Sequence, residues 1–139
     1  LPSTAVVALQ TGSQDLANLL RSQGMRVAEA RTGVEVVAHL FPRGTSYVEP
    51  SLLVLSAQLP GYNGLSVLAG VRSLGRRTPT IMTWPEDEEW MALEAVRLGV
   101  ASLVREPATT SDLVAAIQTL PFASVARPVD LGVLRQRVS

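Results

Sequence analysis

Few side chains in this sequence combine the types and spacing that catalysis requires. Ser56 follows an apolar run and precedes a turn, and a serine hydroxyl is a poor nucleophile unless a base activates it. The only histidine, His39, lies near the end of a predicted helix, toward the opposite edge of the predicted sheet. There is no cysteine, which excludes a disulfide, a thiolate nucleophile and a zinc site built on sulfur. We therefore expect that the protein is not an enzyme.

A second candidate site is the segment from Gln10 to Ala17, with the sequence Gln-Thr-Gly-Ser-Gln-Asp-Leu-Ala. Hydroxyls and backbone amides at a helix N-terminus can hold a phosphate group, and this segment is similar to the phosphate loop of flavodoxins. An FMN-binding domain is therefore the alternative function. Against it, the loop is shorter than the flavodoxin pattern, and no aromatic pair is placed to sandwich an isoalloxazine ring. We interpret Asp15 as a first-turn residue that favours the helix dipole.

Short apolar runs alternate with amphipathic segments along the chain, a pattern typical of βαβ units. Five such units predict a flavodoxin-like α/β fold, a doubly wound parallel five-stranded sheet with helices on both faces. The predicted strands are Ala5–Leu9, Arg26–Ala30, Leu52–Leu55, Thr80–Thr83 and Ser102–Val104. The predicted helices are Asp15–Gln23, Val34–Leu40, Leu65–Leu74, Glu88–Leu98 and Ser111–Leu120.

Turn and cap residues mark the ends of these elements. Gly24 and Gly99 follow the first and fourth helices, and Thr110 or Ser111 is expected to cap the last. The segment Phe41–Pro50 is expected to be a mobile loop away from the site. Residues 1–120 are predicted to form one domain, and residues 121–139 a linker or tail in which Asp130–Val138 has the spacing of a short helix.

Overall composition narrows the function further. Twelve basic residues balance twelve acidic ones, so no global field favours nucleic acid or an anionic membrane. No apolar run approaches the ~20 residues that a membrane-spanning helix needs, and no secretion signal is visible. We expect a cytoplasmic protein that binds neither nucleic acid nor membrane directly.

One loop carries a specific resemblance. Residues 52–65 read Leu-Leu-Val-Leu-Ser-Ala-Gln-Leu-Pro-Gly-Tyr-Asn-Gly-Leu, which resembles the end of the third strand and the following loop in response-regulator (CheY-like) receiver domains. Glycine and asparagine suit the chain reversal because they accept left-handed conformations. The five βα units and the spacing from Gly99 to Pro107 agree with that family, which implies the same fold.

The resemblance also implies which residues carry receiver chemistry, and these positions depart from the family. The phosphoacceptor aspartate corresponds to Ser56, which lacks the carboxylate that forms an acyl phosphate. The acidic pair that holds magnesium corresponds to Gln10 and Thr11, or to Thr11 and Gly12, which supply no anionic oxygen. We expect neither phosphorylation nor a magnesium site, and no other cofactor.

Two further family positions are also changed. The switch hydroxyl at the end of the fourth strand corresponds to Trp84; Thr83 would serve only with a register shift that turns its side chain to the other face. The lysine before the last loop corresponds to Glu106, or to Arg105 with a slip of one residue. We expect Trp84 to fill the space left by the missing aspartates, Glu106 to be solvated, and Pro107 to follow a cis peptide as in the family.

The resemblance implies a degenerate receiver, a phosphorylation-independent signalling module of a bacterial regulatory protein. Its expected partners are another protein or an attached effector domain. Receivers also dimerise through the face formed by the fourth helix, fifth strand and fifth helix. Here these elements carry Leu93, Val96, Arg97, Arg105, Leu113 and Ile117. The acidic run Glu86–Glu89 is interpreted as a solvated helix start, with partner recognition as the alternative.

Overall fold

A computed structural model of the chain describes residues 3–120, so the predicted tail and its short helix lie outside the described residues. All five strands are parallel and lie in the order β2-β1-β3-β4-β5. They are β1 (Thr4–Ala8), β2 (Arg26–Glu29), β3 (Leu52–Ser56), β4 (Thr80–Trp84) and β5 (Ser102–Arg105). The predicted strands and the flavodoxin-like topology are confirmed.

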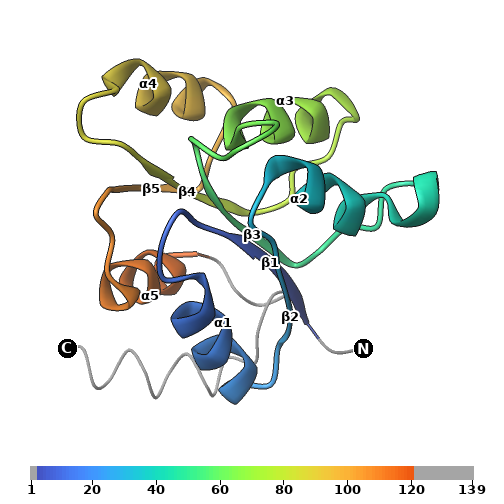
Figure 1. Ribbon diagram of the computed structural model, residues 1–139, viewed down its shortest axis with the longest axis horizontal. Helices are drawn as coiled ribbons and strands as arrows, with labels where there is room; N and C mark the ends of the chain where they lie inside the picture. Colours follow the sequence, from blue (N-terminus) through green and yellow to red (C-terminus); the bar gives the residue numbers. More distant parts are fainter. Residues whose placement is uncertain (1–2, 121–139) are drawn as a thin grey trace.

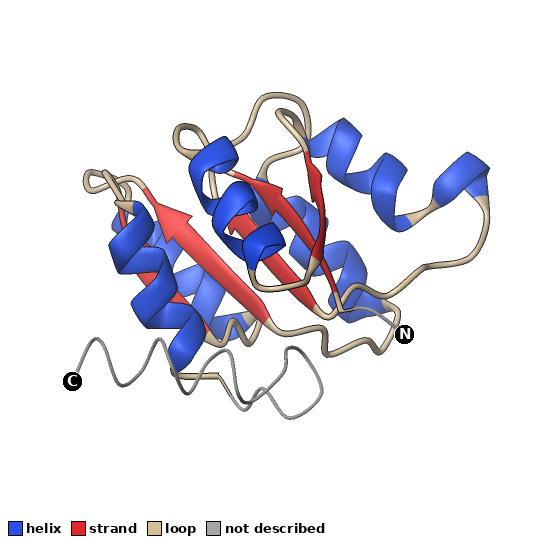
Figure 2. Cartoon of the chain, turned by 90° about the horizontal axis from the view of Figure 1, so that it is seen from below, coloured by secondary structure: helices blue, strands red, loops and turns tan. Residues whose placement is uncertain are grey.

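Helices cover both faces of the sheet (Figure 1). α1 and α5 lie on one face, and α2, α3 and α4 on the other. The bounds are α1 (Ser13–Ser22), α2 (Gly33–Leu40), α3 (Gly64–Ser73), α4 (Glu89–Arg97) and α5 (Thr110–Gln118). Figure 2 shows the layered arrangement from below. Within residues 3–120, no helix is long and apolar enough to span a membrane.

Two apolar cores lie on opposite faces of the sheet because side chains alternate along each strand. In β3 every residue is buried, which agrees with the apolar run Leu52–Leu55 that precedes Ser56. Leu52 and Val54 face the core beneath α1 and α5, whereas Leu53 and Leu55 face α2, α3 and α4. Ser56 continues the first of these two rows, so the alternation itself directs its side chain to the α1 and α5 side.

Side-chain caps start three of the helices. Thr32 accepts a hydrogen bond from the Glu35 amide at the start of α2, and Asn63 accepts one from the Ser66 amide at the start of α3. The cap of α5 is Thr109, which forms a reciprocal capping box with Asp112. The sequence prediction of Thr110 or Ser111 at this position is therefore wrong by one or two residues, because the helix begins earlier.

The connection Phe41–Pro50 contains a short 3₁₀ helix at Pro42–Gly44 and is held to the domain by side-chain contacts. The Tyr47 hydroxyl and the buried Thr78 hydroxyl lie 2.8 Å apart, and Thr78 donates to a Glu49 carboxylate oxygen at 3.1 Å. Burial raises the pKa of Tyr47, which favours the neutral hydroxyl in this contact. The loop thus packs at the end of the sheet where β3 and β4 begin, opposite to the end that carries Ser56.

Candidate functional site

The candidate site begins with Ser56, the last residue of β3. Its side chain is 0% exposed, and its Cα is in register with Thr83 on β4. In-register residues of parallel strands direct their side chains to the same face, so the two hydroxyls lie side by side. The Ala57 amide donates to the Thr83 carbonyl at 2.7 Å, which continues the pairing of β3 with β4 past Ser56. The end of β3 is therefore fixed against β4 rather than free in a loop.

Glu106 brings a carboxylate into contact with both hydroxyls. One oxygen, Oε2, accepts a hydrogen bond from Ser56 Oγ at 2.7 Å and one from Thr83 Oγ1 at 2.7 Å. Glu106 directly follows β5, and its amide donates to the Trp84 carbonyl at 2.8 Å. The Glu106–Pro107 peptide is cis, as expected. Glu106 is partly buried and accepts two hydrogen bonds, so the expectation that it is solvated is wrong.

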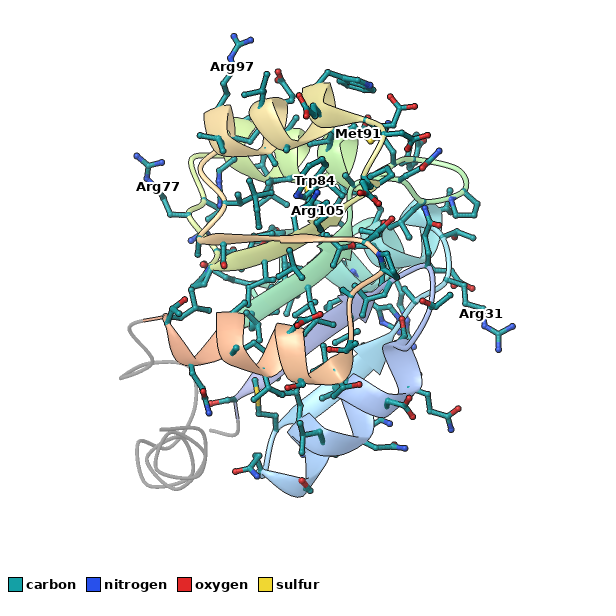
Figure 3. All side chains as sticks on the ribbon, turned by 90° about the vertical axis from the view of Figure 1, so that its left-hand side faces the viewer. Arg31, Arg77, Trp84, Met91, Arg97 and Arg105 are labelled. Carbon is teal, nitrogen blue, oxygen red and sulfur yellow. The ribbon has the colours of Figure 1, made fainter. Side chains whose placement is uncertain are left out.

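Trp84 does not occupy this site. Thr83 and Trp84 are consecutive in β4, so they face opposite sides of the sheet. Trp84 is partly buried and packs against the apolar core on the α2, α3 and α4 face, and Figure 3 shows it beside Arg105. The Arg105 guanidinium lies 6.0 Å from the centre of the Trp84 ring. The hydroxyl at the site comes from Thr83, and the side chain that contacts the strand ends is that of Glu106, so the expectation that Trp84 fills this space is wrong.

The loop after β1 forms the outer wall of the site. Gln10 Nε2 donates to the Gln58 carbonyl at 2.8 Å, which links this loop to the loop after β3. Ser13 Oγ accepts a hydrogen bond from the Leu9 amide at 2.9 Å. Thr11 and Gly12 are exposed, and Thr11 lines the hollow at the site. A hollow of about 310 Å³ is lined by Leu9, Gln10, Thr11, Thr83, Pro85, Glu86, Glu106, Pro107 and Ala108.

A larger groove lies on the other side of the same loop. Its volume is about 1110 Å³, and its polar lining residues are Gln10, Thr11, Ser13, Gln14, Glu29, Arg31, Glu35 and Gln58. Of the aromatic residues in the described part of the chain, none lines it. The groove therefore lacks a platform for an isoalloxazine ring, which argues against the FMN-binding alternative.

The donor set at these strand ends does not fit magnesium. That ion prefers a near-octahedral shell of oxygens that includes carboxylates. Gln10, Thr11 and Gly12 contribute only neutral groups. Of the two carboxylates that line the hollow, Glu106 already accepts two hydroxyl hydrogen bonds and Glu86 is ion-paired with Arg105. Within residues 3–120, no group of three or more His, Cys, Asp or Glu side chains is placed to hold a metal ion.

His39 lies on the exposed side of α2, where it lines a small hollow with residues of β1 and β2 that include Thr4 and Arg26. Thr4 and Arg26 start their strands, whereas Ser56 ends β3. The histidine therefore lies at the opposite edge of the sheet from Ser56, as predicted, and is not the base for that hydroxyl.

A comparison with protein families decides the identity of this fold. Residues 10–118 match the model of the response regulator receiver domain. The chain belongs to the receiver domain family. This receiver is 29% identical over 119 residues to the alkaline phosphatase synthesis transcriptional regulatory protein SphR of Synechococcus elongatus, covering 83% of this chain and 46% of SphR. It is 24% identical over 119 residues to the transcriptional regulatory protein FixJ of Azorhizobium caulinodans, covering 86% and 52%.

The receiver domain thus spans about half the length of these two relatives. Solved structures agree on the fold. A receiver domain protein of Methanospirillum hungatei superposes with a TM-score of 0.70 at 15% identity, covering 99% of both chains. The receiver domain of AraT from Geobacillus stearothermophilus gives a TM-score of 0.70 at 18% identity, covering 100% of both chains. These likenesses confirm the receiver fold.

Sequence reasoning located part of the site. It singled out Ser56 and Glu106, and the structure brings these two together. It also singled out Gln10, which reaches the loop after Ser56 through the Gln58 carbonyl. It assigned the switch position to Trp84 and not to Thr83. The available signal for Thr83 was a hydroxyl residue next to an aromatic residue at the end of a buried strand. The Thr83 hydroxyl becomes recognisable as a site group only when its carboxylate partner from β5 is known.

Proposed function

We propose that this receiver is a signalling module that works without aspartyl phosphorylation and has no enzymatic activity. It acts in a bacterial regulatory protein through contacts with another protein or an attached output domain. The observation that carries the proposal is the contact of Ser56 with Glu106. The phosphoacceptor position holds a buried hydroxyl that donates a hydrogen bond to a carboxylate. A serine hydroxyl does not form the acyl phosphate that an aspartate forms, and the Glu106 carboxylate repels an incoming phosphoryl anion where the neutral Gln10–Gly12 segment supplies no ligands for a counter-ion.

The neutral Gln10–Gly12 segment supports the same proposal. In receivers the acidic pair at this place binds magnesium, which neutralises the phosphoryl group. Glutamine, threonine and glycine offer no anionic oxygen for that role. We therefore propose that the domain takes up neither magnesium nor another cofactor at these strand ends, and that its state is set by a partner, by oligomerisation or by a ligand.

Incubation of the chain with magnesium and acetyl phosphate, or with magnesium and beryllofluoride, tests this function. We expect an unchanged intact mass and an unchanged ¹H–¹⁵N correlation spectrum. A receiver that has a phosphoacceptor aspartate and the acidic pair serves as the positive control under the same conditions. Stoichiometric modification, or a specific shift of the amides around Ser56, would overturn the proposal.

The proposed partner surface lies on α4 and β5. Three apolar side chains of α4 are exposed at helical spacing, with Leu93 68% exposed between Trp90 and Val96. Arg105 of β5 lies next to this helix and forms an exposed ion pair with Glu86 at 3.7 Å. Leu113 and Ile117 of α5 are buried in the core and are not available for contact. We propose that a second copy of the chain packs on this surface.

Replacing Leu93 by glutamate is expected to weaken self-association at least about tenfold, because a charge would enter the apolar centre of the interface. The dissociation constant is measured by sedimentation velocity over a concentration series. Val48→Glu is the control, since Val48 is an exposed apolar residue in the loop before β3, where it lines a hollow with residues of β1 and β2. Equal effects of the two substitutions, or a wild-type chain that is monomeric throughout, would exclude this dimer surface.

A further inference from the structure

A single carboxylate oxygen ties together the ends of three neighbouring strands. Glu106 Oε2, just after β5, accepts from Ser56 at the end of β3 and from Thr83 near the end of β4, each at 2.7 Å. The two hydroxyls are almost completely buried, with Ser56 0% and Thr83 2% exposed. The contact joins residues that are 50 and 23 positions apart in the chain. It is therefore a tertiary contact and not a local turn.

The proton positions follow from the chemistry of the groups. A serine or threonine hydroxyl has one proton to donate, and an ionised carboxylate only accepts. Ser56 Oγ also lies 3.2 Å from the Gln58 carbonyl, a longer distance to a neutral acceptor. Hydrogen bonds to a charged acceptor are shorter and stronger, so the serine proton points to Glu106. Both hydroxyls thus donate to the same oxygen, and the Gln58 amide donates to Ser56 Oγ at 3.3 Å.

In receivers that are phosphorylated, the switch hydroxyl bonds an oxygen of the phosphoryl group and draws its loop inward. Resting on the proposed function, we infer that the Glu106 carboxylate is a permanent internal substitute for that anionic oxygen. It keeps the Thr83 hydroxyl turned inward and holds the ends of β4 and β5 in one arrangement. We call the contact of Ser56, Glu106 and Thr83 the carboxylate tether.

The tether adjoins the proposed partner surface through two peptide bonds. Thr83 is followed by Trp84, and Arg105 is followed by Glu106, while Trp84 and Arg105 are in register on β4 and β5. Successive residues of a strand face opposite sides, so the tether lies on the α1 and α5 side. Trp84 and Arg105 lie together on the α4 side, as Figure 3 shows. We therefore expect a change in the tether to alter the environment of Trp84 and Arg105.

The Glu106 amide provides a direct readout of the tether, because it donates to the Trp84 carbonyl and so reports the pairing of these strand ends. Ser56→Ala and Thr83→Val each remove one hydroxyl with little change in volume. We expect each substitution to lower the hydrogen-exchange protection of the Glu106 amide about tenfold. We also expect each to shift the Trp84 indole resonance by more than its linewidth, in the same direction for both variants.

Two controls keep the test specific. Thr83→Ser retains the hydroxyl and is expected to keep wild-type protection and the wild-type indole shift. Glu29→Gln neutralises a hydrogen-bonded carboxylate at the end of the edge strand β2 and is expected to leave both readouts unchanged. Wild-type readouts in folded Ser56→Ala and Thr83→Val would overturn the tether. Phosphorylation of the wild-type chain would instead overturn the proposed function, so the two failures are distinguishable.

Discussion

Replacing Ser56 by aspartate, the residue that receivers use as phosphoacceptor, is expected to lower the free energy of unfolding by about 3 kcal/mol. The Ser56 hydroxyl is buried and lies 2.7 Å from a Glu106 carboxylate oxygen. A second carboxylate there would bring two like charges into contact where little water screens them. Urea unfolding followed by circular dichroism measures the change as a shift of the midpoint with a constant slope.

Combining Ser56→Asp with Glu106→Lys is expected to recover at least about half of that loss, because the two introduced groups attract instead of repel. The control for the substitution itself is Ser66→Asp, at an exposed first-turn position of α3 where the helix dipole favours an acid. That variant is expected to unfold like the wild type. If the Ser56→Asp variant were as stable as the wild type, the contact of Glu106 with the side chain at position 56 would be contradicted.

Replacing Gly64 by alanine is expected to destabilise the chain by about 3 kcal/mol or to prevent folding. Gly64 is the first residue of α3 and packs directly under the end of β3, where an added Cβ would overlap the Ser56 carbonyl oxygen. The neighbouring backbone is held in place, since the Gly64 amide donates to the Ala57 carbonyl at 3.0 Å. Relief of the overlap therefore requires α3 to move away from the site. The packing lost in this movement lowers the Tm, which thermal unfolding measures.

Gly70→Ala is the matched control in the same helix. No atom lies within 4 Å of the Cβ that this substitution adds, and Gly70 is exposed in the interior of α3. Alanine favours the helix by about 1 kcal/mol over glycine, so the control is expected to raise the Tm. If Gly64→Ala were as stable as Gly70→Ala, the close approach of α3 to Ser56 would be contradicted.

The sequence by itself determined the order and the kind of the elements. The alternation of apolar runs with amphipathic segments predicted all five strands and all five helices, with ends that differ from the observed bounds by no more than two residues. Gly24 and Gly99 have positive φ angles of 91° and 77° after the first and fourth helices, as their positions implied. These features depend on residues that are close in the sequence, so a local sequence pattern is enough to predict them.

The roles of residues in the loop after β3 could be predicted only in part. Gly61 has a φ of 76°, which agrees with the predicted left-handed reversal. Asn63 instead has a φ of −71° and caps α3, and Gly64 is required because α3 approaches the Ser56 carbonyl closely. The motif was read correctly as a turn, but the reason for its last glycine is a contact between two elements, which the local sequence does not contain.

Only the tertiary structure decided what the site is. Ser56 was identified from the sequence as a missing phosphoacceptor and Glu106 as a missing lysine, two separate substitutions. Folding brings them into one hydrogen bond with a sequence separation of 50 residues, and adds Thr83 in place of Trp84. Strand register selects which of two consecutive side chains faces inward, and register is set by the packing of β3, β4 and β5 together. For that reason, the sequence predicted the departure of the site from the receiver pattern, but not the contact that occupies it.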